Sequence, residues 1–217
     1  MKKTFYLRHK KSFEKFNGLL LGNTVLERGL VLSPVIVASY NYQNSIILGI
    51  SFVMITFFTV LLSSFIPKKI PYTIRSIFYT LIACAIFIPT AMWMDSIYPE
   101  QVFKLGIFLP LLVANSLIVV KSESRFHKHK KGMMIVDLLC HTIGFFLVIV
   151  LVGTIREIIG NGTLMGQAIS LPFKVPAIIY PFSGFILVGF LAALVKRIKY
   201  KLENPKERNP IAVPETK

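Results

Sequence analysis

Four apolar runs in this sequence are each long enough to cross a lipid bilayer. They cover residues 45–66, 73–94, 134–155 and 177–195, against the roughly 20 residues that a spanning helix requires. Shorter apolar runs at 29–39 and 106–120 raise the number of predicted segments to six. Only 16% of residues are charged, and most lie between the runs, because a charge at the bilayer centre costs about 2.5 kcal/mol or more. The sequence therefore predicts an all-α membrane protein with six transmembrane segments.

The basic residues predict the orientation of these segments. Of the 25 Lys and Arg residues, all but Lys104, Arg156 and Lys174 fall in the N-terminal arm, the second and fourth connections and the C-terminal tail. Positive charge is retained in the cytoplasm, so both termini are predicted to be cytoplasmic. Residues 1–27 then form a cytoplasmic or interfacial arm, 28–198 the membrane domain and 199–217 a basic tail. We attribute the net charge of +15 to topology and contact with anionic lipid, and expect no nucleic-acid partner.

The two short runs resemble each other. Gly29-Leu-Val-Leu-Ser-Pro34-Val-Ile-Val-Ala aligns with Gly106-Ile-Phe-Leu-Pro110-Leu-Leu-Val-Ala-Asn115 when one gap is allowed. Each run opens a group of three segments, about 28–95 and 104–198, which predicts a 3+3 inverted repeat because three is odd. Proline disrupts the preceding helical turn, so two half-helices are expected to meet near the membrane midplane. Alternatively, the similarity reflects the apolar composition of membrane segments alone.

A few polar residues inside or beside the predicted segments are candidates for function. Asp137 and His141 lie one helical turn apart and can touch, which suits either a proton or ion path or an interfacial pair. Asn115 offers a carbonyl oxygen of the kind that hard cations accept. Arg156 and Glu157 predict an ion pair near a helix end. We expect no dedicated metal site, and the two cysteines suggest no disulfide framework.

Four stretches of the chain resemble one known family. They are residues 29–34, 65–70, 105–115 and 153–166, within a resemblance that runs from about 17 to 198. The family is that of the Rnf/Nqr integral-membrane subunits, and the Asn-Gly-Thr ending at 161–163 favours the E-type member of Rnf, equivalent to the D-type member of Nqr. Family members work in complexes that couple electron transfer from ferredoxin or NADH to Na⁺ or H⁺ movement, and the E-type protein pairs with an A-type sister of opposite orientation.

The resemblance also implies a cofactor, but this sequence lacks the residues that usually bind it. Each sister subunit of the family gives two cysteines, one from each half-helix, to an intramembrane iron–sulfur cluster. Here the corresponding positions are Ser33 and Ser116. Neutral serine is a poorer ligand than thiolate, so we expect the usual cluster to be absent or altered and no cofactor in this chain alone. The two serines instead suit a polar path or hydrogen bonds to helix carbonyls.

These observations predict a membrane subunit of an Rnf/Nqr-like ion-translocating electron transport complex in the cell membrane of a prokaryote. No Walker loop, dinucleotide fingerprint or HExxH motif is present, so flavin or nicotinamide chemistry would come from partner subunits. Two alternatives stay open. One is an independent small permease, since inverted repeats with broken helices also describe transporters; the other is a redox-inactive scaffold paralogue.

Overall fold

The computed structural model describes residues 23, 25–27, 29–67, 69–124, 131–165, 167–169 and 174–203, so most of the predicted arm and tail lie outside the described residues. Four long helices overlap the four long apolar runs, as predicted. They are α2 (Tyr42–Ser63), α3 (Tyr72–Ile97), α6 (Lys131–Asn161) and α7 (Pro181–Glu203). All four are long and apolar enough to cross a membrane.

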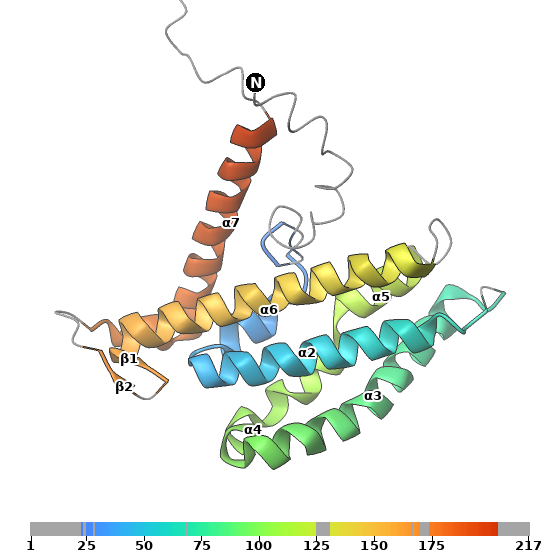
Figure 1. The fold of residues 1–217 in the computed structure, drawn as a ribbon, viewed down its shortest axis with the longest axis horizontal. Helices are drawn as coiled ribbons and strands as arrows, with labels where there is room; N and C mark the ends of the chain where they lie inside the picture. The colour runs from blue at the N-terminus through green and yellow to red at the C-terminus, as the bar shows by residue number, and fades with distance from the viewer. Residues whose placement is uncertain are drawn as a thin grey trace, which may run out of the picture.

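Helix α2 lies between α3 and α6 (Figure 1). The approach of α2 and α6 is close because small residues face each other: a Cβ added at Gly153 would lie 1.9 Å from the Ser45 Oγ atom. Further along the same contact, the rings of Phe52 and Phe145 stack with their centroids 3.8 Å apart. Both rings are fully buried, so this contact forms the centre of the apolar core.

The second short run forms a bent pair of helices. α4 (Pro99–Leu105) is followed directly by η2 (Gly106–Phe108), and η3 (Pro110–Ala114) is separated from α5 (Ser116–Ser124) by Asn115 alone. The two halves, Pro99–Phe108 and Pro110–Glu123, are bent by 46° and together are apolar enough to make one span. The first short run is a five-residue π-helix, η1 (Pro34–Ala38). The described residues therefore contain four or five candidate spans, and the count of six stays a prediction.

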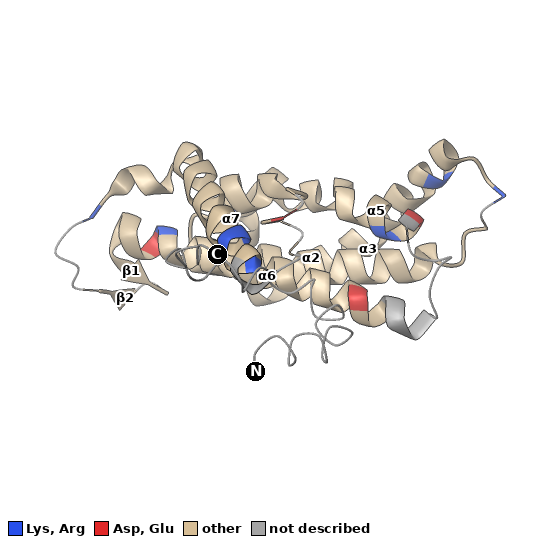
Figure 2. Cartoon of the chain, turned by 90° about the horizontal axis from the view of Figure 1, so that it is seen from above, with Lys and Arg blue, Asp and Glu red and all other residues tan. Residues whose placement is uncertain are grey.

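Helix α7 follows the connection at residues 162–180 and stands apart from the other long helices. The connection holds a two-stranded hairpin, β1 (Thr163–Leu164) with β2 (Gln167–Ala168), and the 3₁₀-helix η4 (Pro176–Ile179). α7 rises from η4 at a steep angle to α6 (Figure 1) and contacts η1 and η4 at its beginning. Charged residues gather near the helix ends, and the middle of each long helix carries none (Figure 2). This distribution agrees with helices that cross lipid.

Candidate functional site

The first half-helix is short and buried, and its ends are irregular. Gly29 has a φ of +62°, a conformation that glycine adopts at no steric cost. Pro34 begins η1, and Ser39 ends it with φ −86° and ψ 57°. The Ser39 hydroxyl donates to the Val35 carbonyl. The run at residues 29–39 therefore contains a short helix that breaks before α2 begins.

Arg156 of α6 holds the end of this half-helix. Its guanidinium donates to the carbonyls of Ile36 at 2.6 Å and Ser39 at 3.2 Å. The remaining three N–H groups reach the η4 segment, donating to the carbonyls of residues 178, 179 and 180 at 3.1, 2.5 and 3.3 Å. The side chain is 0% exposed. Since the last carbonyls of a helix lack intrahelical partners and carry partial negative charge, Arg156 joins η1 and η4 by satisfying both.

Glu157 points to a different element. Its Oε2 atom accepts a 2.7 Å hydrogen bond from the backbone N–H of Tyr42, the first residue of α2. The Thr163 hydroxyl donates to Oε1 at 3.3 Å. A carboxylate is favoured at a helix N-terminus. The predicted ion pair between Arg156 and Glu157 is therefore wrong: the two side chains bind opposite ends of the break between η1 and α2.

The second half-helix is held at Asn115. Gly106, where α4 gives way to η2, has a φ of +48°, and Pro110 begins η3. Asn115 follows η3 in an extended conformation. Its amide donates to the Leu112 carbonyl at 2.7 Å and to the Thr56 hydroxyl at 3.3 Å, and its Oδ1 atom accepts from the N–H of Ile118 at 3.0 Å. Asn115 thus caps α5 and fastens the break to α2.

Ser33 lies at the beginning of η1 and Ser116 directly after the break at Asn115, and both are exposed. Ser33 directly precedes Pro34, and Ser116 is the first residue of α5. Within the described part of the chain neither hydroxyl makes a hydrogen bond, so the predicted bonds to helix carbonyls are not found. A neutral hydroxyl lacks the charge and softness by which thiolates hold iron–sulfur clusters. The two donors at these positions therefore do not fit a thiolate-ligated cluster.

Asp137 and His141 contact each other and a third residue, Lys121, that the sequence predicted to lie in a loop. The Lys121 Nζ atom lies 2.6 Å from Asp137 Oδ2, with the lysine side chain only 3% exposed. His141 Nδ1 lies 2.8 Å from the Asp137 carbonyl and 3.6 Å from Oδ1. The group joins α5 to α6. Helical spacing offered a signal for Lys121, because it shares a face with the buried residues Leu117 and Ile118.

Other polar side chains extend this group across the same end of the bundle. Ser63 of α2 and Ser122 of α5 share a buried 2.8 Å hydrogen bond. The carboxylate of Glu123 in α5 accepts hydrogen bonds from two residues of α3, the Arg75 guanidinium at 2.8 Å and the Tyr79 hydroxyl at 2.9 Å. We call these five residues, together with Lys121, Asp137 and His141, the polar layer. It ties four helices together where the bundle meets the membrane surface in the predicted topology.

Comparison with known proteins settles the family. The family described as "Rnf-Nqr subunit, membrane protein" matches residues 13–192, a range that includes both half-helices, the polar layer and Arg156. The chain belongs to the Rnf-Nqr subunit family. Among curated relatives, the E subunit of the ion-translocating oxidoreductase complex of Aliivibrio fischeri is 31% identical over 212 residues, which cover 90% of this chain and 93% of the relative.

Other Rnf-Nqr relatives agree with this match. The protein of the same name from Shewanella oneidensis is 30% identical over 210 residues, covering 90% of this chain and 89% of the relative. The one from Haemophilus ducreyi is 31% identical over 148 residues, covering 68% of this chain and 65% of the relative. The resemblance predicted from four short motifs is therefore confirmed over most of the chain.

Proposed function

We propose that this chain is the E-type membrane subunit of an ion-translocating oxidoreductase complex of the Rnf/Nqr kind. One observation carries the proposal: the match to proteins of that name extends over 90% of the chain at about one identical residue in three. The match is not confined to apolar segments that any membrane protein shares, because it spans both half-helix breaks and the connections. The subunit would pair with an A-type sister of opposite orientation in a prokaryotic cell membrane.

We propose a six-segment inverted repeat, supported by the two half-helices, with both termini cytoplasmic, supported by the distribution of Lys and Arg. Gly29 and Gly106 both have positive φ angles. Each is followed by a proline-initiated short helix and then by a break, at Ser39 and at Asn115, before an α-helix begins. Irregular backbone of this kind is tolerated at membrane depth where it is buried in protein or lines a cavity. A reporter fused to the C-terminus, active only on the cytoplasmic side, would test the orientation.

We infer that this subunit does not hold the family's cluster through its own half-helices. Ser33 and Ser116 are both exposed and both present neutral oxygen donors. The scaffold around them is intact, since Arg156 and Asn115 hold the two breaks in place. The chain therefore supports assembly or ion coupling, and electrons follow another route or the complex is redox-inactive.

Purification from native membranes tests the proposed assembly. The chain, tagged at its C-terminus and expressed from its own locus, is extracted in a mild detergent, and the co-purifying polypeptides are identified by mass spectrometry. We expect a second Rnf-Nqr family subunit in equal amount, together with further subunits of an oxidoreductase. A matched tag on an unrelated six-segment protein of the same membrane is the control. A chain that purifies by itself under conditions that preserve other complexes would contradict the proposal and favour the permease.

A further inference from the structure

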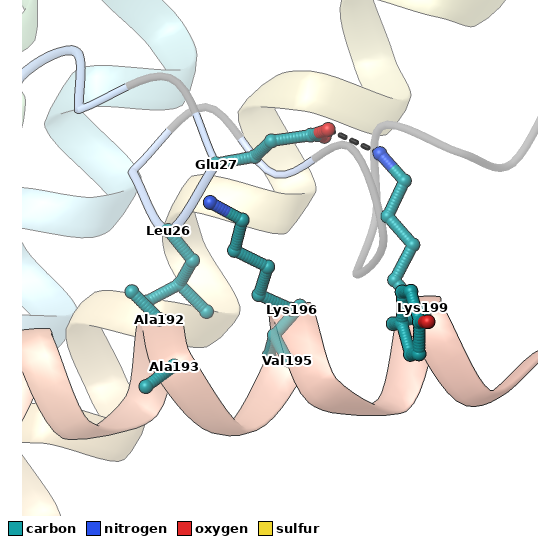
Figure 3. A pocket seen from close by; sticks show the side chains of 8 residues that line it. Leu26, Glu27, Ala192, Ala193, Val195, Lys196 and Lys199 are labelled. Atoms are coloured by element: carbon teal, nitrogen blue, oxygen red, sulfur yellow. Dashed lines mark hydrogen bonds and ion pairs between the residues drawn. The ribbon is translucent and has the colours of Figure 1, made fainter.

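A cavity of about 500 Å³ lies between α7 and the turn at residues 25–27 (Figure 3). Its floor is apolar and consists of Leu26 from the turn with Ala192, Ala193 and Val195 from α7. Its rim is polar and consists of Glu27 with Lys196, Lys199 and Tyr200. This volume falls within the roughly 300–1,000 Å³ that small-molecule sites occupy, and it is separate from the half-helices and the polar layer.

The rim carries a net positive charge. Lys199 is paired with Glu27, whereas Lys196 makes no ion pair with any described residue. In Figure 3 the ammonium group of Lys196 extends from α7 toward the Glu27 turn. Two ammonium groups and one carboxylate leave an excess of one positive charge over an apolar floor. A ligand that complements this rim carries one negative group.

The position of the cavity on α7 supplies the second requirement on the ligand. The apolar span of α7 runs from Pro181 to Tyr200, so Lys196 and Lys199 lie near its end, at the depth of a membrane surface. Below them α7 exposes large apolar side chains, Phe190 and Leu194 among them. A ligand at this place therefore has hydrocarbon beneath its charge.

We propose that this cavity binds one anionic phospholipid. The phosphate lies between Lys196 and Lys199, and the acyl chains follow Leu26, Ala192 and Val195 down the face of α7. A soluble anion would use the rim and leave the apolar floor without a partner, whereas a zwitterionic lipid would bring a second positive charge to a rim that already has one in excess. The lipid links α7 to the segment that precedes the first half-helix.

Native mass spectrometry of the full-length chain in detergent tests the proposal. Phosphatidylglycerol and phosphatidylcholine are added at equal concentrations, and the bound fraction of each is measured. We expect phosphatidylglycerol to bind preferentially and K196Q to weaken it about fivefold, the effect of one lysine near a membrane surface. E27Q removes the competing carboxylate and strengthens binding. R197Q is the matched control, because Arg197 is exposed on the same turn and does not line the cavity.

Three outcomes would overturn the proposal. Equal binding of the two lipids would show that the rim does not select charge. Equal losses in K196Q and R197Q would show general surface attraction with no site. Release of the lipid by millimolar inorganic phosphate alone would identify a site for free phosphate. Unchanged melting temperatures establish that each variant is folded. The experiment uses the isolated chain, so its result is independent of whether the chain assembles with oxidoreductase subunits.

Discussion

Replacing Arg156 tests whether a single side chain holds the first half-helix. R156M keeps an unbranched apolar stem but removes the charge and all five N–H donors, each of which meets a carbonyl within 3.3 Å. Each carbonyl left buried without a donor costs about 1–3 kcal/mol, and with partial replacement by other donors we expect the five together to cost about 3–5 kcal/mol. For a chain of this length each kcal/mol lowers Tm by about 2–4 °C. R156M should therefore lower Tm by between about 6 and 20 °C.

Hydrogen exchange shows which segments depend on Arg156, whereas Tm reports only the stability of the whole chain. Hydrogen exchange in detergent should rise at residues 36–42 and 178–183 in R156M, because these segments lose their common partner, and stay unchanged in α3. R156K keeps the charge but has three donors, so it should fall between R156M and the wild type. K104M is the matched control, since the Lys104 side chain is 57% exposed and its ion pair with a described residue is a long one, with Glu100 at 3.7 Å.

Two results would refute this reasoning. If the Tm of R156M equals that of K104M and of the wild type, the five carbonyls do not depend on the guanidinium. If R156M melts low but exchange rises equally in α3, the arginine supports the whole bundle and not the half-helix.

Three further substitutions test other contacts by thermal unfolding in detergent. D137N should cost about 3–5 kcal/mol because it leaves the buried Lys121 without its carboxylate; a Tm equal to that of wild type would mean that the lysine reaches water. G153A should cost about 1–3 kcal/mol because its Cβ would lie 1.9 Å from a hydroxyl of α2. The control G189A, where an added Cβ meets nothing within 4 Å, should be neutral or slightly stabilising. Equal effects of the two substitutions would contradict the close approach of α2 and α6. N115A should cost about 1 kcal/mol because α5 loses its cap, and N115S should keep most of the wild-type stability because serine can also cap a helix. Equal losses of stability in the two variants would show that the cap is not the cause.

The long helices were predictable from hydropathy because lipid as a solvent constrains composition over every 20 residues or so. The half-helices were predictable as breaks, since Gly29, Pro34, Gly106 and Pro110 each act locally on the backbone. Their conformations were not: η1 is a π-helix and η3 a 3₁₀-helix, and both pack against helices distant in the sequence. The count of six segments and the inverted repeat stay predictions.

The partners of the half-helices could not be predicted from local sequence. Arg156 lies 120 residues from the Ile36 carbonyl that it binds, and nothing in the chain near either residue records that contact. The sequence placed Arg156 beside Glu157 and suggested that they pair, although adjacent residues on a helix point in different directions. Lys121 was counted among the basic residues of a loop, which were used to predict the orientation of the helices. Such a count does not distinguish an exposed lysine from one that is paired with Asp137.

The iron and acid-labile sulfide content of the purified pair of sister subunits tests the central claim, that the chain keeps the E-type scaffold without the usual cluster ligands. We predict a stable pair with no [2Fe–2S] signal in its EPR spectrum after dithionite, and iron near two per pair only in the S33C/S116C variant, which restores thiolates beside the intact half-helices. Near two irons per wild-type pair, with that signal, would contradict the account, because it would show that serines or partner cysteines assemble the centre.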